Sequence, residues 1–262
     1  MIVSTMKPLS PMNDFMVEQT NALLSWKRLR CNPLIIIVGD DAGVPEFCQS
    51  HQVINHKEVK KNNYGTPLVG DILRIGWSYC NDEDICIYIN ADIIVDNTLC
   101  DTLDAFVSAY PNYHQQKYFL TSIRYDWYNY SSINFDDPNW YQNINKNMQG
   151  NWSTPDGIDI FIHKKDTFKN IPDVAIAKWN YDTWLLNYAI KNFDISIDIT
   201  KTTHLMHQFG KWFQDKKVCP RKTFTNEIRE QVNIMGQFHY DYNNITQCKL
   251  KSKMVNTKII FE

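Results

Sequence analysis

The fold is indicated most strongly by one stretch of the chain, Ile85-Cys86-Ile87-Tyr88-Ile89-Asn90-Ala91-Asp92. Its first five residues form an uninterrupted apolar run, which is typical of a strand buried on both faces of a parallel sheet. The run leads directly into Asn90-Ala91-Asp92, so two oxygen-bearing side chains stand at the carboxyl end of the strand, where open α/β sheets bind ligands. Asn90 and Asp92 are two residues apart and face the same way on an extended backbone. The pattern indicates either a Mg²⁺ or Mn²⁺ site, since these ions prefer oxygen ligands, or a strand end closed by polar turn residues.

Similar runs recur on both sides of this strand and alternate with helical segments. We expect strands at 2–5, 34–38, 53–56, 118–123, 157–163 and 195–199, and helices at about 13–29, 44–50, 67–79, 97–109 and 181–192. This alternation predicts right-handed crossovers and an open, mostly parallel α/β sheet flanked by helices. Residues 129–155 show no sustained period, and an irregular stretch of this length in a compact domain indicates either a functional loop or a misread element. The more basic segment 213–262 is expected to add a helix at about 224–238 and a weak hairpin at about 245–260.

The composition is that of a globular protein. The chain has 262 residues, of which 44% are apolar and 21% charged, and this excludes a disordered chain. A formal charge of −2 provides no general attraction to nucleic acid or to an anionic membrane. The longest strongly apolar stretch, Leu34 to Val38, is too short to cross a bilayer, and no signal peptide is visible. Seven cysteines without a C-x-x-C pair argue against a disulfide framework and a structural zinc site and suit a reducing compartment. We therefore expect a soluble cytoplasmic protein.

Three further polar groups are candidates for chemistry. Asp40, at the end of the second expected strand, is either a contact to a ribose or base or part of an ordinary Asp-rich turn. His207 follows the last expected strand and either completes a metal site with Asp92 or is a surface histidine. Asp182 opens a helix, where an acid is ordinary because of the helix dipole, or it acts as a general base beside aromatic side chains. The chain contains no P-loop, G-x-G-x-x-G or G-x-S-x-G motif, which disfavours P-loop kinases, standard Rossmann dehydrogenases and α/β-hydrolases.

The order of these motifs resembles that of the nucleotide-sugar glycosyltransferases of the GT-A fold, in particular family-2-like members. The matching segments are Ser4-Thr5-Met6-Lys7, Val38-Gly39-Asp40-Asp41, Asn62-Asn63-Tyr64-Gly65-Thr66-Pro67, Asn90-Ala91-Asp92 (the DxD metal motif), Gly157 to Phe161, Trp179 to Leu185, and His207-Gln208. The resemblance covers roughly residues 1–212. It departs from the family pattern at Asn90, where the family usually has Asp, and this removes one negative charge from the site.

The resemblance implies a Rossmann-like nucleotide-binding half and an acceptor-binding half within a catalytic domain at 1–212, with 213–262 as an extension packed on it. The implied activity is inverting transfer of a sugar from a nucleoside-diphosphate donor, with UDP as the expected nucleotide, to a hydroxyl of a growing glycan. Asp182 would be the catalytic base, and Asp92 and His207 would bind Mn²⁺ or Mg²⁺. The expected donor contacts are Ser4, Thr5, Asp40, Asn63, Tyr64, Gly65, Thr66, Asn90, Ala91 and Arg124, and the expected acceptor or sugar contacts are Trp127, Asp156, Asp159 and Trp179.

Two alternatives remain open from the sequence. A sugar-phosphate nucleotidyltransferase also uses an α/β sheet, a metal and a nucleotide, but it generally needs a Gly-rich basic loop after the first strand. That place holds Lys7-Pro8-Leu9-Ser10-Pro11, which has no glycine. A carbohydrate-binding protein without catalysis would use the aromatic residues alone, although such modules are more often β-rich.

Overall fold

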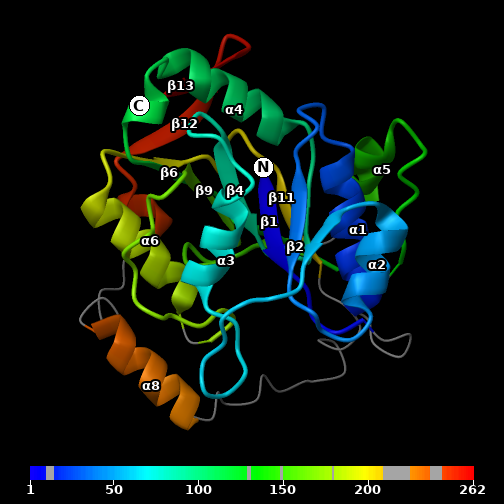
Figure 1. Ribbon diagram of the computed structural model, residues 1–262. Coiled ribbons are helices and arrows are strands. Elements are labelled where there is room, and N and C mark those ends of the chain that lie inside the picture. Colours follow the sequence, from blue (N-terminus) through cyan, green and yellow to red (C-terminus); the bar gives the residue numbers. More distant parts are fainter. Residues whose placement is uncertain (10–14, 129–130, 148–149, 179, 209–224, 237–243) are drawn as a thin grey trace.

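The computed structural model describes residues 1–9, 15–128, 131–147, 150–178, 180–208, 225–236 and 244–262. Its centre is a nine-stranded sheet in the order β13-β12-β10-β6-β9-β4-β1-β2-β3 (Figure 1). Five of the eight neighbouring pairs are parallel, and the antiparallel ones are the two pairs made by β9 and the β12–β13 hairpin. The strands are β1 (Ile2–Thr5), β2 (Ile35–Val38), β3 (Ile54–His56), β4 (Ile85–Ile89), β6 (Tyr118–Thr121), β9 (Ile160–Lys164), β10 (Ile195–Asp198), β12 (Leu250–Val255) and β13 (Lys258–Phe261). The predicted mostly parallel α/β sheet is confirmed.

Helices cover both faces of this sheet. The described helices are α1 (Phe15–Lys27), α2 (Val44–His51), α3 (Val69–Trp77), α4 (Thr98–Ala109), α5 (Trp140–Asn147), α6 (Tyr181–Asn192) and α8 (Asn226–Met235), of which α5 packs on the second, smaller sheet described below. Alternate residues of each strand enter different cores, because successive strand side chains point to opposite faces. Ile2 packs with α1, α2 and α4, whereas its neighbour Val3 packs with α3 and α6. Both faces of the central strands are therefore buried, which accounts for their uninterrupted apolar sequences.

A second, smaller sheet lies beside the carboxyl end of β4, and the sequence analysis did not predict it. Its order is β5-β11-β7-β8, formed by β5 (Ile93–Val95), β11 (Leu205–Gln208), β7 (Tyr125–Trp127) and β8 (Gly150–Trp152). Of the two interpretations of residues 129–155, the misread element is correct, because this range contains α5 and β8. Both elements are short and are held by contacts distant in sequence, so they produce no readable periodicity.

The C-terminal hairpin is part of the central sheet. β12 runs parallel to β10, with Leu250 opposite Ile197, and β13 forms the outer edge. The predicted helix at about 224–238 corresponds to α8, and the predicted hairpin at about 245–260 corresponds to β12 and β13 preceded by a short 3-10 turn. The expected boundary between 212 and 213 lies outside the described residues.

The structure pairs Cys31 with Cys100 in a disulfide, contrary to the cysteine pattern. These residues are 69 positions apart, but the chain after α1 lies against the first turn of α4, and no local spacing could reveal this proximity. Because of this disulfide, the cysteines no longer indicate that the protein resides in a reducing compartment. Among the described helices, none is long and apolar enough to cross a membrane.

Candidate active site

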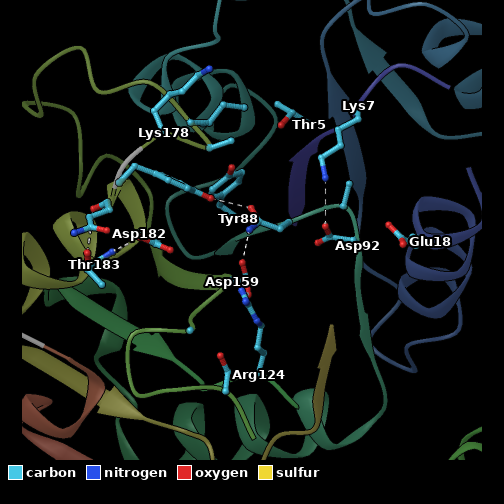
Figure 2. Close-up of a pocket in the computed structure, with 18 of the residues that line it drawn as sticks. Thr5, Lys7, Glu18, Tyr88, Asp92, Arg124, Asp159, Lys178, Asp182 and Thr183 are labelled. Carbon is cyan, nitrogen blue, oxygen red and sulfur yellow. Dashed lines mark hydrogen bonds and ion pairs between the residues drawn. The ribbon is translucent and has the colours of Figure 1, made fainter. Parts of the chain in front are cut away.

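A cavity of about 430 Å³ opens at the carboxyl ends of β1 and β4. Its walls come from residues 5–7, the start of α1, Tyr88 and residues 90–92, five residues between 153 and 159 with Arg124, and residues 176–183 except the undescribed 179. Figure 2 shows Lys7 and Asp92 on one side, Asp182 and Thr183 on the opposite side, and Asp159 with Arg124 between them. The cavity therefore lies where the sequence places the ligand site of a parallel sheet.

Asn90 is held by two hydrogen bonds that use both atoms of its side-chain amide. Its Nδ2 donates to Asp159 Oδ1 at 2.5 Å, and its Oδ1 accepts from the hydroxyl of Tyr181 at 3.0 Å. The Asn90 backbone N–H also donates to the Asp159 carbonyl at 3.0 Å. An aspartate at position 90 would instead place two carboxylates in contact, which is unfavourable in a partly buried site. The departure from the DxD pattern therefore has a local electrostatic reason.

Arg124 connects two acidic side chains at the base of the cavity. Its Nη1 donates to Asp159 Oδ2 at 2.6 Å and its Nε to Asp126 Oδ1 at 2.8 Å. Burial alone would lower the pKa of this guanidinium, but the two carboxylates outweigh it and raise that pKa. Arg124 is thus a fixed cation with two charge-assisted hydrogen bonds.

Asp92 and His207 face each other across the junction of β4 and the smaller sheet. His207 Nε2 lies 3.6 Å from Asp92 Oδ2, and its Nδ1 lies 3.2 Å from Asp126 Oδ1. Burial opposes the charge on both partners, but their mutual attraction lowers the pKa of Asp92 and, together with Asp126, raises that of His207 to about 9. Lys7 Nζ approaches Asp92 Oδ2 at 3.9 Å. Within the described part of the chain, Asp92 Oδ1 is buried and has no hydrogen-bond partner.

Asp182 lies on the far wall, in the first turn of α6. Burial raises the pKa of this carboxyl to about 6, although the backbone N–H of Thr183 donates to its Oδ1 at 2.8 Å and opposes the shift. The negative charge of Asp159 adds to the increase. A carboxyl of this kind changes protonation close to neutral pH, as a general base must.

The remaining predicted site residues differ in where they lie. Thr5, Ala91 and Asp156 line the cavity together with Asn90, Asp92, Arg124, Asp159 and Asp182. Ser4 is fully buried and donates to the Ile89 carbonyl at 2.6 Å, so its hydroxyl joins β1 to β4. Trp127 does not line the cavity, because it packs with Ile94, Ile144 and Met206 between the smaller sheet and α5. Trp179 lies outside the described residues.

The residues expected to contact the nucleotide from neighbouring loops do not line this cavity. Asp40 is exposed, and its Oδ1 lies 3.5 Å from Lys61 Nζ. Tyr64 donates its hydroxyl to Glu230 Oε1 at 2.7 Å, and Thr66 donates to Glu227 Oε1 at 2.5 Å. Asn63 and Gly65 are exposed in the same loop. The polar groups of Tyr64 and Thr66 thus face α8, which lies outside the family resemblance.

Several cavity residues were not assigned from the sequence. Lys7 lies two residues after the end of β1, and its position close after a buried strand was an available signal. Gln19 holds the Lys7 backbone by accepting from its N–H at 2.7 Å and donating to its carbonyl at 3.2 Å. No local pattern marks Gln19, Glu18 or Lys178, which reach the cavity only through the packing of α1 and of the chain before α6.

Comparison with known proteins identifies the fold. No protein-family model and no curated protein sequence matches this chain. The structure of S. aureus TarS 1–349 in complex with UDP superposes with a TM-score of 0.50 at 10% identity, over 79% of this chain and 60% of that chain. The structure of GalNAc-T7 with UDP, GalNAc and Mn²⁺ superposes with a TM-score of 0.47 at 10% identity, over 89% of this chain and 47% of that chain. A putative glucose-1-phosphate thymidylyltransferase from Bacillus anthracis superposes with a TM-score of 0.44 at 11% identity, over 87% of this chain and 99% of that chain.

The chain therefore has the GT-A fold of nucleotide-sugar transferases, as the motif order predicted. At this level of identity the likeness concerns the fold alone. The chain spans about 60% of the length of the TarS structure.

Proposed function

We propose that this protein is a glycosyltransferase that moves a sugar from a nucleoside-diphosphate donor, with UDP as the nucleotide, to a hydroxyl of a glycan acceptor. The observation that carries the proposal is the pairing of two groups across one cavity. Asp182 has a buried carboxyl whose pKa is raised to about 6. It lies across the cavity from a cluster of fixed charges around Asp92. The GT-A fold and the UDP bound by the TarS structure support the choice of donor.

Asp182 is the proposed general base. It accepts the proton of the acceptor hydroxyl while the acceptor oxygen forms a bond to the anomeric carbon of the sugar. The bond from that carbon to the diphosphate oxygen breaks at the same time, and the leaving diphosphate takes the electron pair. A single displacement of this kind inverts the configuration at the anomeric carbon. Tyr181 donates to Asn90, and Asn90 in turn donates to Asp159 and holds it in place. Burial raises the pKa of Asp182, and the Asp159 charge adds to the increase.

Lys7 and Arg124 supply positive charge near the proposed diphosphate position. Lys7 reaches the cavity above Asp92, with its backbone fixed by Gln19. Thr5 and Ala91 lie at the strand ends where the nucleoside would enter. Asp156 and Asp159 offer carboxylate oxygens to sugar hydroxyls on the opposite side.

The side chains near Asp92 fit a divalent cation in part. The buried, unpaired Oδ1 of Asp92 is an oxygen donor of the type that Mn²⁺ and Mg²⁺ prefer. His207 fits as a nitrogen ligand after it loses the proton that the neighbouring carboxylates stabilise. The described residues contain no cluster of three or more His, Cys, Asp or Glu side chains able to hold a metal, so diphosphate oxygens and water would complete the shell. A cation bound there would neutralise charge on the leaving diphosphate.

Calorimetric titration of UDP in the presence and absence of Mn²⁺ tests donor binding, and incubation with a panel of nucleotide sugars tests turnover. Release of UDP is expected, whereas release of pyrophosphate would identify a nucleotidyltransferase instead. A protein that binds glycans but not UDP would be a carbohydrate-binding module.

The variant Asp92→Ala tests the metal assignment. We expect it to lose the increase in UDP affinity that Mn²⁺ produces, because the main oxygen ligand is removed. Asp101→Ala, which changes an exposed acid on α4 paired with Arg30, is the matched control and should keep the increase. An unchanged metal-dependent affinity in Asp92→Ala would place the metal elsewhere.

A further inference from the structure

The helix α8 lies beside α6 and beside the loop at 62–66, although it belongs to the extension outside the family resemblance (Figure 1). Its residues contact the chain on both sides of Asp182. These contacts come from Glu227, Gln231 and Met235, which are spaced four residues apart and therefore lie on one face of the helix.

Gln231 forms a two-point contact with the backbone before α6. It is only 3% exposed, its Oε1 accepts from Ala175 N–H at 2.8 Å, and its Nε2 donates to the Ala175 carbonyl at 2.8 Å. The other edge of the same segment is paired with the start of α3. Val69 N–H donates to the Val174 carbonyl at 2.9 Å, and Ile176 N–H donates to the Pro67 carbonyl at 3.0 Å. Residues 174–176 are therefore held from both sides, as an inner strand is held in a sheet.

Glu227 joins the next part of this segment to the loop at 62–66. Its Oε1 accepts from Asn62 Nδ2 at 2.9 Å and from Thr66 Oγ1 at 2.5 Å, and its Oε2 lies 2.9 Å from Lys178 Nζ. The side chain is only 11% exposed, so these contacts are sheltered from solvent. Burial opposes its charge, but the three donors outweigh it and lower the pKa of Glu227.

The end of α8 contacts α6 itself. Trp184 Nε1 donates to the Met235 carbonyl at 3.1 Å, and Trp184 lies two residues after Asp182. Met235 is buried in the core that α3 and α6 share. The segment that carries Asp182 is thus held by α8 before it, at Ala175 and Lys178, and after it, at Trp184.

The residues between these contacts form one wall of the cavity, namely Ile176, Ala177, Lys178, Asn180, Tyr181, Asp182 and Thr183. We propose that α8 positions this wall for the nucleotide-sugar donor and that Glu227 is its positioning residue, acting through Lys178. This inference rests on the proposed function. Because Glu227 holds the Lys178 ammonium at 2.9 Å, Lys178 serves as the anchor of the wall. In Figure 2 the ammonium group of Lys178 points away from Asp182 and Asp159.

The test compares four variants by calorimetric titration with UDP: Glu227→Gln, Lys178→Met, the double variant, and Glu230→Gln. The glutamine at 227 keeps an oxygen for Asn62 and Thr66 but removes the charge that holds Lys178. We expect about tenfold weaker UDP binding in Glu227→Gln and in Lys178→Met. The double variant should bind as the single variants do, because both remove the same contact.

Glu230→Gln is the matched control, since it removes one charge from the same helix and keeps an acceptor for Tyr64. Its UDP affinity should stay within twofold of wild type. Hydrogen exchange supplies a second measurement that does not involve nucleotide, and the amides of residues 174–178 should exchange faster in Glu227→Gln and not in Glu230→Gln. Thermal melting shows whether each variant is folded. If Glu227→Gln is not folded, Lys178→Met tests the same contact in its place.

Two different failures can be told apart. A wild-type protein that binds no UDP overturns the proposed function and the inference with it. A wild type that binds UDP, with Glu227→Gln binding it equally and showing unchanged exchange, overturns the inference alone. Independent, multiplying losses in the double variant would also overturn it, because they would mean that Glu227 and Lys178 act separately.

Discussion

Asn90 shows how the identity of one residue depends on a neighbour distant in sequence. Its amide donates to Asp159 and accepts from Tyr181, and a carboxylate would lose the first contact. Asp159 in turn pairs with Arg124 and adds negative charge near Asp182. The cavity therefore does contain the negative charge that a DxD motif would have at position 90. It is provided by Asp159, the residue directly before β9. Asn90 itself fixes the positions of the Asp159 and Tyr181 side chains through its two hydrogen bonds.

Asp182→Asn should separate binding from catalysis. We expect transfer to fall by about 10²- to 10⁴-fold, the usual contribution of a general base, while UDP binding stays within threefold. The wild-type rate should rise with pH up to about 6 and then level, because only the deprotonated carboxyl accepts a proton. Steady-state rates between pH 4.5 and 8 measure this. Near-normal transfer by Asp182→Asn would contradict the assignment.

The same substitution should change stability in a pH-dependent way. Because the pKa of Asp182 is higher in the folded protein than in the unfolded chain, its contribution to stability is present below about pH 4 and lost as pH rises through about 6. At pH 8, Asp182→Asn should therefore be more stable than wild type, by at most about 3 kcal/mol at 1.36 kcal/mol per pKa unit. Urea unfolding at pH 4 and pH 8 tests the sign, and equal differences at both values would contradict it.

Arg124→Met should destabilise the protein, because it leaves Asp126 and Asp159 without their shared cation. We expect a loss of about 3 kcal/mol in the free energy of unfolding at pH 7. The pKa of Asp126 is lowered against the effect of burial by His207 and Arg124, so the loss should shrink as pH falls through that lowered pKa. Arg28→Met breaks a pair with Asp136, which is 91% exposed, and should change stability by less than about 0.5 kcal/mol. Urea unfolding of both variants decides this, and equal losses would contradict the buried network.

At the scale of elements, the smaller sheet holds one side of the site. Its strand β11 carries His207 and its strand β7 carries Asp126, and the two are paired directly. The aromatic residues of this region, Trp127, Trp140 and Tyr141 among them, pack around Ile144 and Met206. The aromatic-rich stretch after β6 therefore builds the support of the smaller sheet, and its tryptophan at 127 is turned away from the cavity.

Gly150 allows β8 to approach β7. A Cβ at this position would lie 1.9 Å from the Asp126 carbonyl oxygen and 2.8 Å from Tyr125, so Gly150→Ala must push the strands apart. We expect a loss of about 2–3 kcal/mol in the free energy of unfolding, as for other overpacked sites. Gly70→Ala, in the first turn of α3, meets only the flexible side chain of Ile171 at 3.3 Å and should be neutral or slightly stabilising. Urea unfolding compares the two, and equal stability of both variants would contradict this account.

At the scale of the whole molecule, the cavity is formed by segments that are far apart in sequence. The near-neutral charge of −2 provides no general surface potential that attracts an anion, so in the proposed function the attraction of the diphosphate is assigned to local groups such as Lys7 and Arg124, which line the cavity. Segments near residues 5, 90, 124, 156 and 182 meet at one cavity, and α8 supports one of its walls.

The Cys31–Cys100 disulfide should stabilise the whole domain, because it closes a loop of 69 residues that would otherwise be free in the unfolded chain. A loop of this size corresponds to about 4 kcal/mol in the chain-entropy estimate. Cys31→Ser should therefore unfold at lower urea concentration than wild type under oxidising conditions. A reductant should lower wild-type stability to that of Cys31→Ser and leave the variant unchanged. A wild-type protein insensitive to reductant would contradict the pairing.

The sequence alone determined the central architecture, because strands buried on both faces and the helices between them impose local periods that can be read directly. It also located Asp92, Arg124, Asp159 and Asp182, which lie beside such elements and line one cavity. It could not predict the smaller sheet, the disulfide or the contacts of α8, because these depend on pairings between segments tens of residues or more apart. Only the tertiary structure decided that Asn90 binds Asp159, that Trp127 is buried, and that Tyr64 and Thr66 face α8. In each case the partner comes from a distant part of the chain, and a local pattern carries no information about it.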